Sequence, residues 1–84
     1  MELRSMIRDF VVENFLFGDD TRLGSDDLSL LDNGIMDSLG VMDLVAFLES
    51  RLGLQVPDSD LVPQNLDSVD NLVAYVERRR ATAA

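Results

Sequence analysis

Apolar residues recur at three- and four-residue steps near the start of the chain. The set is Leu3, Met6, Ile7, Phe10, Val11 and Phe15. This spacing places their side chains on one face of a helix, so the pattern predicts a helix over about residues 2–17. Gly18 is expected to end it, because glycine readily adopts the left-handed conformation that closes many helices.

A second amphipathic pattern occupies the middle of the chain and predicts a helix from Ser38 to Leu52, stopped by Gly53. The positions expected to face the core are Val41, Leu44, Val45, Leu48 and Leu52. The neighbouring stripe mixes apolar and acidic residues, namely Leu39, Met42, Asp43, Ala46 and Glu49. We expect Met42 to be partly exposed, because its neighbours Val41 and Val45 take the core side.

The segment between these helices, residues 18–37, is predicted to be a long connection with a short helical turn around residues 26–31. It is polar but carries Leu23, Leu28, Leu30 and Leu31. A connection of this length is unusual inside a compact domain. We therefore expect its leucines to pin it across the other helices.

The remaining third of the chain predicts two further helices. Residues 54–57 are expected to be extended, because the residue before a proline avoids the helical region. A short third helix is predicted over Asp58–Val62, ended by Pro63, and the last helix is predicted to begin at Ser68. Three arginines, residues 78–80, would then complement the dipole at its C-terminal end.

The absence of any long alternating pattern argues against a sheet, so the predicted fold class is all-α. We expect a small bundle of three main helices and a short third helix, with the long loop between the first and second helices. The chain is expected to be one domain over residues 1–84, free-standing and monomeric, with residues 80–84 as a flexible tail.

Composition excludes several kinds of function. The 84 residues include no cysteine and no histidine. The chain therefore lacks Ser-His and Cys-His nucleophilic pairs and the usual thiolate and imidazole metal ligands. This composition argues against a self-contained hydrolase.

Charge points towards protein partners. The net charge is −9, from 16 acidic and 7 basic residues. Such a surface repels nucleic acid and anionic membranes and attracts basic patches on other proteins. Neither a signal peptide nor an apolar run of spanning length is present, so we expect a cytoplasmic protein that does not insert into membranes.

Asp37-Ser38-Leu39, at the start of the second predicted helix, is the main candidate for chemistry. A serine there lies at the positive end of the helix dipole, where free backbone N–H groups would stabilise a phosphate ester on its hydroxyl. Taken alone, an Asp-Ser pair before a helix is far more often a cap, worth about 1 kcal/mol, than a site of covalent attachment. Asp67-Ser68 repeats the pair before the last helix. No glycine turn precedes it and no mixed apolar-acidic stripe follows, so Ser68 is interpreted as a cap only.

Two acidic pairs, Asp19-Asp20 and Asp26-Asp27, invite a calcium interpretation. Counted from Asp19, Gly24 fits the sixth position of an EF-hand loop. The third, fifth and twelfth positions are Thr21, Leu23 and Leu30, which do not fit. The pairs therefore indicate a solvated acidic loop, and no metal site is predicted.

Several segments, in order, resemble the acyl and peptidyl carrier proteins, the phosphopantetheine-binding carrier family. That family typically shows a Leu-Leu-Asp-x-Gly-Leu lead-in, then Asp-Ser-Leu, a Val-Glu-Leu-Val-like run and an Ile-Pro-like step. The matching segments here are Leu30–Ile35, Asp37–Leu39, Met42–Val45 and Val56-Pro57. Residues 66–69 resemble the family's entry into its last helix. Gly40 departs from the pattern, because many fatty-acid carriers have an acidic residue there.

The resemblance implies that a phosphopantetheinyl transferase uses coenzyme A to attach 4'-phosphopantetheine covalently to Ser38. The thiol of this arm would carry an acyl or aminoacyl group as a thioester, so a chain without cysteine or histidine can still serve thiol chemistry. The chain itself would contribute no catalytic residue.

The resemblance also implies a partner-binding surface. Asp37 would help to dock the transferase. The mixed stripe would be recognised weakly by successive enzymes with basic docking patches, such as a loading ligase or acyltransferase and the synthases downstream. Its residues are Leu39, Met42, Asp43, Ala46 and Glu49.

The cargo stays open at this point. One option is acyl groups for fatty-acid or polyketide assembly, and a second is amino or aryl acids for nonribosomal peptide synthesis. A third is D-alanine, since D-alanyl carriers share the Gly-x-x-Asp-Ser-x-Gly arrangement found here at Gly34–Gly40. The alternative from another class is an acidic helical interaction module without a prosthetic group.

Overall fold

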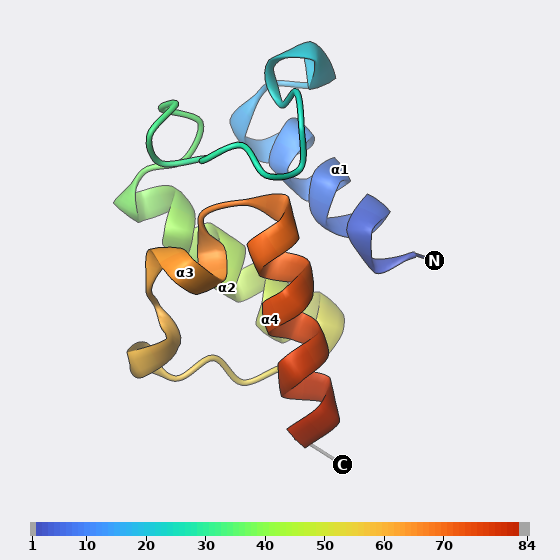
Figure 1. Cartoon of the computed structure of the whole chain (residues 1–84), viewed down its shortest axis with the longest axis vertical. Coiled ribbons are helices and arrows are strands. Elements are labelled where there is room, and N and C mark those ends of the chain that lie inside the picture. The colour runs from blue at the N-terminus through green and yellow to red at the C-terminus, as the bar shows by residue number, and fades with distance from the viewer. Residues whose placement is uncertain (1, 83–84) are drawn as a thin grey trace.

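The computed structural model describes residues 2–82 and shows an all-helical fold. Its elements, in order, are α1 (Leu3–Phe15), the 3-10 turn η1 (Asp20–Arg22), α2 (Ser38–Leu52), the 3-10 turn η2 (Asp58–Asp60), α3 (Pro63–Leu66) and α4 (Val69–Thr82). Figure 1 shows α4 in front of α2, and both α1 and the short α3 lie against α4. Three long helices and one short one confirm the predicted all-α bundle.

The core runs through all three long helices and the loop between α1 and α2. Its fully buried side chains are Ile7, Val11, Leu16, Leu23, Leu30, Leu44, Leu48, Val69, Leu72 and Val76. On α2, Leu44, Val45 and Leu48 are buried as predicted, and Val41 and Leu52 pack partly buried against them. Burial of apolar surface on this scale is the main force that holds so small a domain together.

The long loop is pinned across the bundle, as its leucines predicted. Leu23 and Leu30 are completely buried, and Leu28 and Leu31 pack against the same core. The predicted helical turn at residues 26–31 was wrong, because the turn occurs earlier, at η1. The carboxylate of Asp19 accepts the amide N–H of Thr21 at 3.1 Å and so starts the turn there.

Gly53 ends α2 as predicted, but Pro63 does not end a helix. Gly53 follows α2 with φ 69°, and its N–H donates to the carbonyl of Leu48, as expected for a left-handed C-cap. The predicted helix over residues 58–62 was wrong, because only η2 forms there and Pro63 begins α3 instead of ending a helix. Proline suits a first helical position, where its missing N–H has no intrahelical partner.

Helix α4 continues through Arg80 to Thr82. The last two residues of the tail expected over 80–84, residues 83 and 84, lie outside the part of the chain that the structure describes.

Candidate functional site

Ser38 is the first residue of α2, and its side chain is exposed. Asp37 precedes it in an extended conformation, and the Asp37 carboxylate accepts the amide N–H of Gly40 at 2.8 Å. Asp37 is therefore the N-cap of α2, and the interpretation of Ser38 as that cap was wrong. Aspartate is among the best N-cap residues, so the serine hydroxyl is not needed to begin the helix.

The first turn of α2 suits a negatively charged group on Ser38. The amide of Val41 donates to the carbonyl of Asp37 at 2.9 Å, and that of Gly40 is taken by the Asp37 side chain. The amides of Ser38 and Leu39 precede these and have no carbonyl partner within the helix. Together with the helix dipole, they favour an anion such as a phosphodiester at this end. The residues present therefore fit the group that the sequence resemblance implied.

An apolar pocket of about 260 Å³ opens beside Ser38. It is formed by the end of the long loop, the first turn of α2 and the segment around α3. Besides Ser38 its lining is Leu31, Met36, Val41, Leu61, Val62, Pro63 and Leu66. Because these neighbours are apolar, the pocket can shelter an uncharged group better than a charged one.

The loop that leads to Ser38 is fixed by Asp67, at the junction of α3 and α4. The backbone amide of Leu30 donates to the Asp67 carbonyl at 2.7 Å. The Asp67 carboxylate accepts the Ser29 hydroxyl at 2.6 Å and the Leu31 amide at 2.8 Å. Sequence reasoning missed this role. The one available signal was that an adjacent serine already suffices to cap α4, which leaves the aspartate side chain for another partner.

Gly40 lies buried where α1 meets the first turn of α2. A Cβ atom placed on it would lie 2.9 Å from Phe15 Cε1 and 3.1 Å from Met36 Cγ. Those distances are shorter than normal contacts, so the glycine lets the Phe15 ring pack directly against the α2 backbone. The departure at Gly40 from the usual acidic residue thus has a packing reason.

The predicted partner stripe lies on the outer surface of α2. Leu39 is 76% exposed and Met42 is 58% exposed, which confirms the expected exposure of Met42. Asp43, Ala46 and Glu49 are exposed as well. The carboxylate of Glu49 also accepts the amide N–H of Val56 at 3.2 Å, a structural contact that sequence reasoning did not foresee. The binding roles of Asp37 and of the stripe remain predictions.

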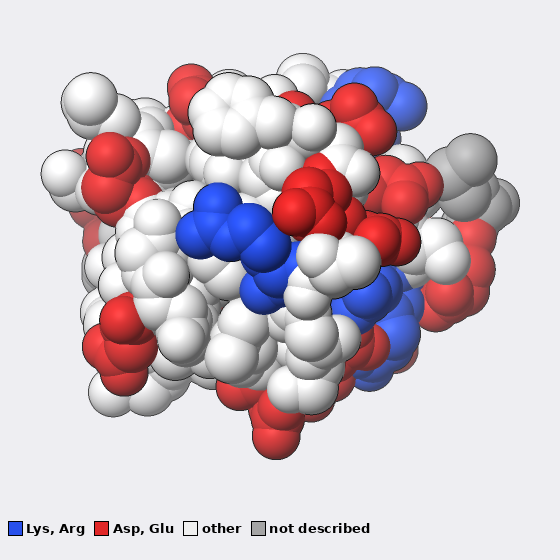
Figure 2. All heavy atoms as spheres, turned by 90° about the horizontal axis from the view of Figure 1, so that it is seen from above, with Lys and Arg blue, Asp and Glu red and all other residues white. Residues whose placement is uncertain are grey.

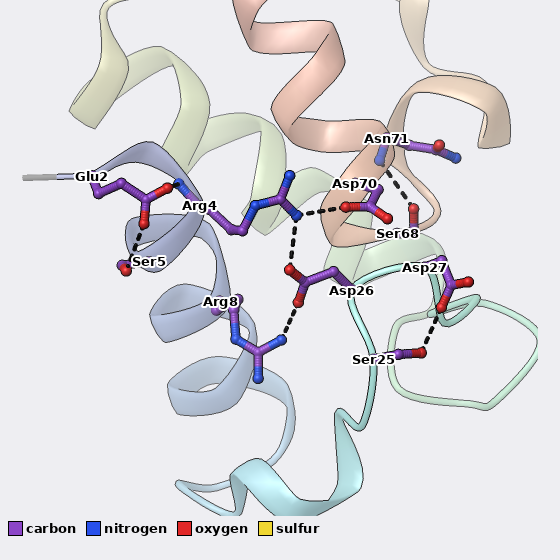
Figure 3. Close-up of polar contacts among 10 residues, drawn as sticks. All are labelled: Glu2, Arg4, Ser5, Arg8, Ser25, Asp26, Asp27, Ser68, Asp70 and Asn71. Carbon is purple, nitrogen blue, oxygen red and sulfur yellow. Dashed lines mark hydrogen bonds and ion pairs between the residues drawn. The ribbon is translucent and has the colours of Figure 1, made fainter.

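Ser68 behaves as the cap that the sequence predicted. Its side chain is only 5% exposed, and its hydroxyl oxygen accepts the amide N–H of Asn71 at 3.0 Å (Figure 3). This is the bond of an N-cap to the third residue of the helix that follows. The hydroxyl is therefore both buried and engaged.

Asp26, an acidic residue of the long loop, pairs with two arginines of α1. Asp26 accepts hydrogen bonds from Arg8 and, at 2.8 Å, from Arg4, and Arg4 also reaches Asp70 at 2.5 Å (Figure 3). Burial alone would raise the pKa of Asp26, but the two guanidinium groups outweigh it and lower that pKa. Residues 2–82 contain no cluster of three or more acidic side chains arranged to hold a metal ion.

Negative charge is spread over the surface. Figure 2 shows the upper end of the molecule of Figure 1, with carboxylates distributed around it and guanidinium groups beside some of them. Among the described helices, none is long and apolar enough to cross a membrane. The cytoplasmic location stays a prediction.

Comparison with known proteins identifies the family. A family model described as "Phosphopantetheine attachment site" matches residues 16–76. The acyl carrier protein of Campylobacter hominis is 34% identical over 77 residues, which are 92% of this chain and 92% of that relative. The acyl carrier protein of Thermotoga maritima is 31% identical over 78 residues, 93% of this chain and 91% of the relative.

A relative of another kind is also similar. D-alanyl carrier protein 1 of Lactiplantibacillus plantarum is 39% identical over 51 residues, 61% of this chain. The match spans 64% of that relative, less than two thirds of its length. On the family match and the two nearly full-length acyl carrier relatives, the chain belongs to the phosphopantetheine-binding family of acyl and peptidyl carrier proteins, non-catalytic carriers that bear a covalent 4'-phosphopantetheine group.

Proposed function

We propose that this chain holds biosynthetic intermediates as thioesters on a 4'-phosphopantetheine arm attached to Ser38. The observation that carries the assignment is that Asp37 caps α2, which leaves the Ser38 hydroxyl exposed at the positive end of the helix. The bound group supplies a thiol, which the chain lacks. The chain supplies the attachment point, the surrounding surface and the pocket beside Ser38.

Loading would form a bond between Ser38 Oγ and the phosphorus next to the pantetheine of coenzyme A. The pyrophosphate link breaks, and adenosine 3',5'-bisphosphate leaves. The hydroxyl proton needs an acceptor, and this chain has no histidine to provide one. The adjacent Asp37 carboxylate already accepts the Gly40 amide, so we expect the transferase to supply the base. This chain positions the hydroxyl and the two first-turn amides beside the new phosphodiester.

The experiment that tests the site is intact mass after incubation with a broad-specificity phosphopantetheinyl transferase, coenzyme A and magnesium. The parent chain should gain one phosphopantetheine, and Ser38→Ala should gain none. Ser68→Ala is the matched control, because it removes the other serine that follows an aspartate before a helix, and it should load like the parent. Loading of Ser38→Ala would contradict the site. A folded parent that never loads would favour the interaction module without a prosthetic group.

Apolar acyl groups are the cargo that the pocket supports best. An amino group that stays charged would lose its hydration among Leu61, Val62 and Leu66 without a hydrogen-bonding partner from these side chains. The fatty-acid and polyketide options are therefore favoured over aminoacyl cargo. Similarity to a D-alanyl carrier and the Gly34–Gly40 arrangement support D-alanine as the second candidate.

Nuclear magnetic resonance would distinguish the two cargoes. The holo-protein would be charged chemically with hexanoyl or with D-alanyl groups, and amide and methyl shifts would be compared with those of the uncharged form. Acyl cargo should shift the Leu61 and Val62 signals, and D-alanyl cargo should leave them in place. Equal shifts for both would remove the argument for acyl cargo.

The partners proposed for the arm are a phosphopantetheinyl transferase, a loading ligase or acyltransferase, and downstream synthases. Exposed Leu39 and Met42 offer apolar contact, and Asp43 and Glu49 offer charge to basic patches. Such contacts should be weak, because a carrier must leave one enzyme before it reaches the next.

A further inference from the structure

Phe17, just beyond the end of α1, is the most exposed large apolar side chain among the described residues, with 92% of its surface open. Its backbone is also unusual. With φ at 55°, it is the only residue other than glycine that has a positive φ in the described chain. Glycine is the residue that normally occupies such a position, because a Cβ atom makes it unfavourable.

The turn itself does not need the phenylalanine ring. The next residue, Gly18, has φ 85°, and its N–H donates to the Val12 carbonyl at 3.0 Å, which closes the end of α1. A glycine at position 17 would make the same turn with less strain. The ring is exposed to water and adds no burial to the core, so the fold gains nothing that accounts for it.

Phe17 lies at the end of the bundle that carries Ser38. The Phe15 ring packs on the backbone of Gly40, so the end of α1 meets the first turn of α2. Phe17 follows Phe15 by two residues, and Ser38 precedes Gly40 by two residues. In Figure 1 the C-terminal end of α1 and the first turn of α2 both lie in the upper half of the view. The chain continues from Phe17 into exposed Asp19 and Asp20.

We propose that Phe17, with Asp19 and Asp20, forms a docking contact for the phosphopantetheinyl transferase, separate from the stripe on α2. The ring would enter an apolar recess of the enzyme, and the two carboxylates would face basic side chains at its rim. This rests on the proposed function, because the transferase has to bring coenzyme A to Ser38 Oγ and therefore covers this end of the molecule.

Charge selects this occupant over a second copy of the chain. A net charge of −9 opposes self-association, and Asp19 and Asp20 would be brought against further acidic surface. A transferase with a basic rim gains from the same charges. The docking contact is thus complementary to an enzyme and not to the chain itself.

The test is the steady-state rate of loading with a transferase that modifies the parent chain, for Phe17→Gly. We expect kcat/KM to fall about tenfold, mainly through KM, while the thermal midpoint stays level or rises because the strained residue is gone. If Phe17 only supports the fold, Phe17→Gly should lower the thermal midpoint and leave kcat/KM unchanged. Phe17→Asn is the second variant, because asparagine also tolerates a positive φ.

The acidic part of the contact is tested by Asp20→Asn, with Glu77→Gln as the matched control. Glu77 is exposed on the C-terminal half of α4, so its loss removes one charge far from Phe17. Asp20→Asn should slow loading and weaken its salt dependence more than Glu77→Gln does. Equal effects of the two would overturn the charged part of the contact.

The outcomes separate this contact from the proposed function. A parent that loads, together with Phe17→Gly and Phe17→Asn variants that load equally fast, overturns the docking contact and leaves Ser38 intact as the site. A parent that does not load at all overturns the proposed function itself. Sedimentation that shows a dimer lost on Phe17→Gly would replace the enzyme by a second copy of the chain.

Discussion

Two helices of this protein start at the same dipeptide, aspartate then serine, but the two aspartates and the two serines have exchanged roles. Before α2, Asp37 caps the helix and Ser38 is exposed. Before α4, Ser68 caps the helix and is buried, while the Asp67 carboxylate reaches back to the long loop. The first pair thus presents a hydroxyl, and the second holds the fold together.

The difference comes from where each helix begins. Helix α2 starts at the serine, so the aspartate is the residue half outside the helix, whereas α4 starts one residue after its serine. In each case one side-chain oxygen takes the amide of the third helical residue, Gly40 or Asn71. A shift of one residue in the helix start therefore decides whether a serine is a cap or an available nucleophile.

The largest effect on stability is expected from Asp67→Ala. This change removes the acceptor for the Ser29 hydroxyl and the Leu31 amide, and hydrogen bonds to a charged group contribute about 1.5–3 kcal/mol each. Because the site is only partly buried, we expect a loss of about 2–4 kcal/mol in the free energy of unfolding. Asp37→Ala loses only a cap, about 1 kcal/mol. Urea unfolding of the two variants measures both values.

Asp67→Asn is the control, because the amide oxygen retains one acceptor. It should fall between the parent and Asp67→Ala. If Asp67→Ala and Asp37→Ala lower the free energy of unfolding equally, the second pair does not stabilise the fold more than the first, and the contrast drawn between them is wrong.

A smaller effect is expected from the serines themselves. Ser68→Ala removes the α4 cap and should lower the free energy of unfolding by about 1 kcal/mol. Ser38→Ala removes no hydrogen bond of the folded chain that the structure shows, so its stability should equal that of the parent. Thermal melts followed by circular dichroism test this directly. Destabilisation by Ser38→Ala as large as by Ser68→Ala would mean that the Ser38 hydroxyl also has a structural role.

Local patterns were sufficient to predict the long helices from the sequence. The apolar spacing in α1 and α2 and the glycine after α2 are properties of neighbouring residues, so they can be identified without the fold. Ser68 as a cap was predicted for the same reason. Ser38 could be singled out because the motif around it is ordered along the chain.

The rest depended on contacts between distant residues. The role of Asp67 requires the long loop to lie against the α3–α4 junction. The Leu31 amide, which donates to the Asp67 carboxylate, is 36 residues earlier in the sequence than Asp67. The tight packing of Phe15 on Gly40 requires α1 and α2 to meet at one point. Pro63 was misinterpreted because proline is compatible both with a helix end and with a first helical turn, and only the structure distinguishes them.

The smallest expected effect concerns pH and comes from Asp26, which lies in the long loop that Asp67 of the second pair also holds in place. Asp26 joins the long loop to α4, because its carbonyl accepts the Asp70 amide at 2.9 Å, and its carboxylate joins the loop to Arg4 and Arg8 of α1. The guanidinium groups hold the pKa of Asp26 below its usual value. The stability from this charge is therefore complete above the unfolded-state pKa of about 3.9 and is lost as pH falls through the lower folded-state pKa.

Comparing the parent with Asp26→Asn isolates this contribution from that of the other carboxylates. The parent should be the more stable of the two near neutral pH, and the gap should close as the pH is lowered below about 4. The gap should be small, because the network is partly open to water and exposed ion pairs contribute little. Asp27→Asn removes the adjacent charge without touching Arg4 or Arg8. Its amide oxygen can still accept the Ser25 hydroxyl, so the variant reports mainly the effect of net charge. A gap between parent and Asp26→Asn that stays constant across this range would mean that the carboxylate acts through its shape and hydrogen bonds, and that charge is not what fastens the loop to α1.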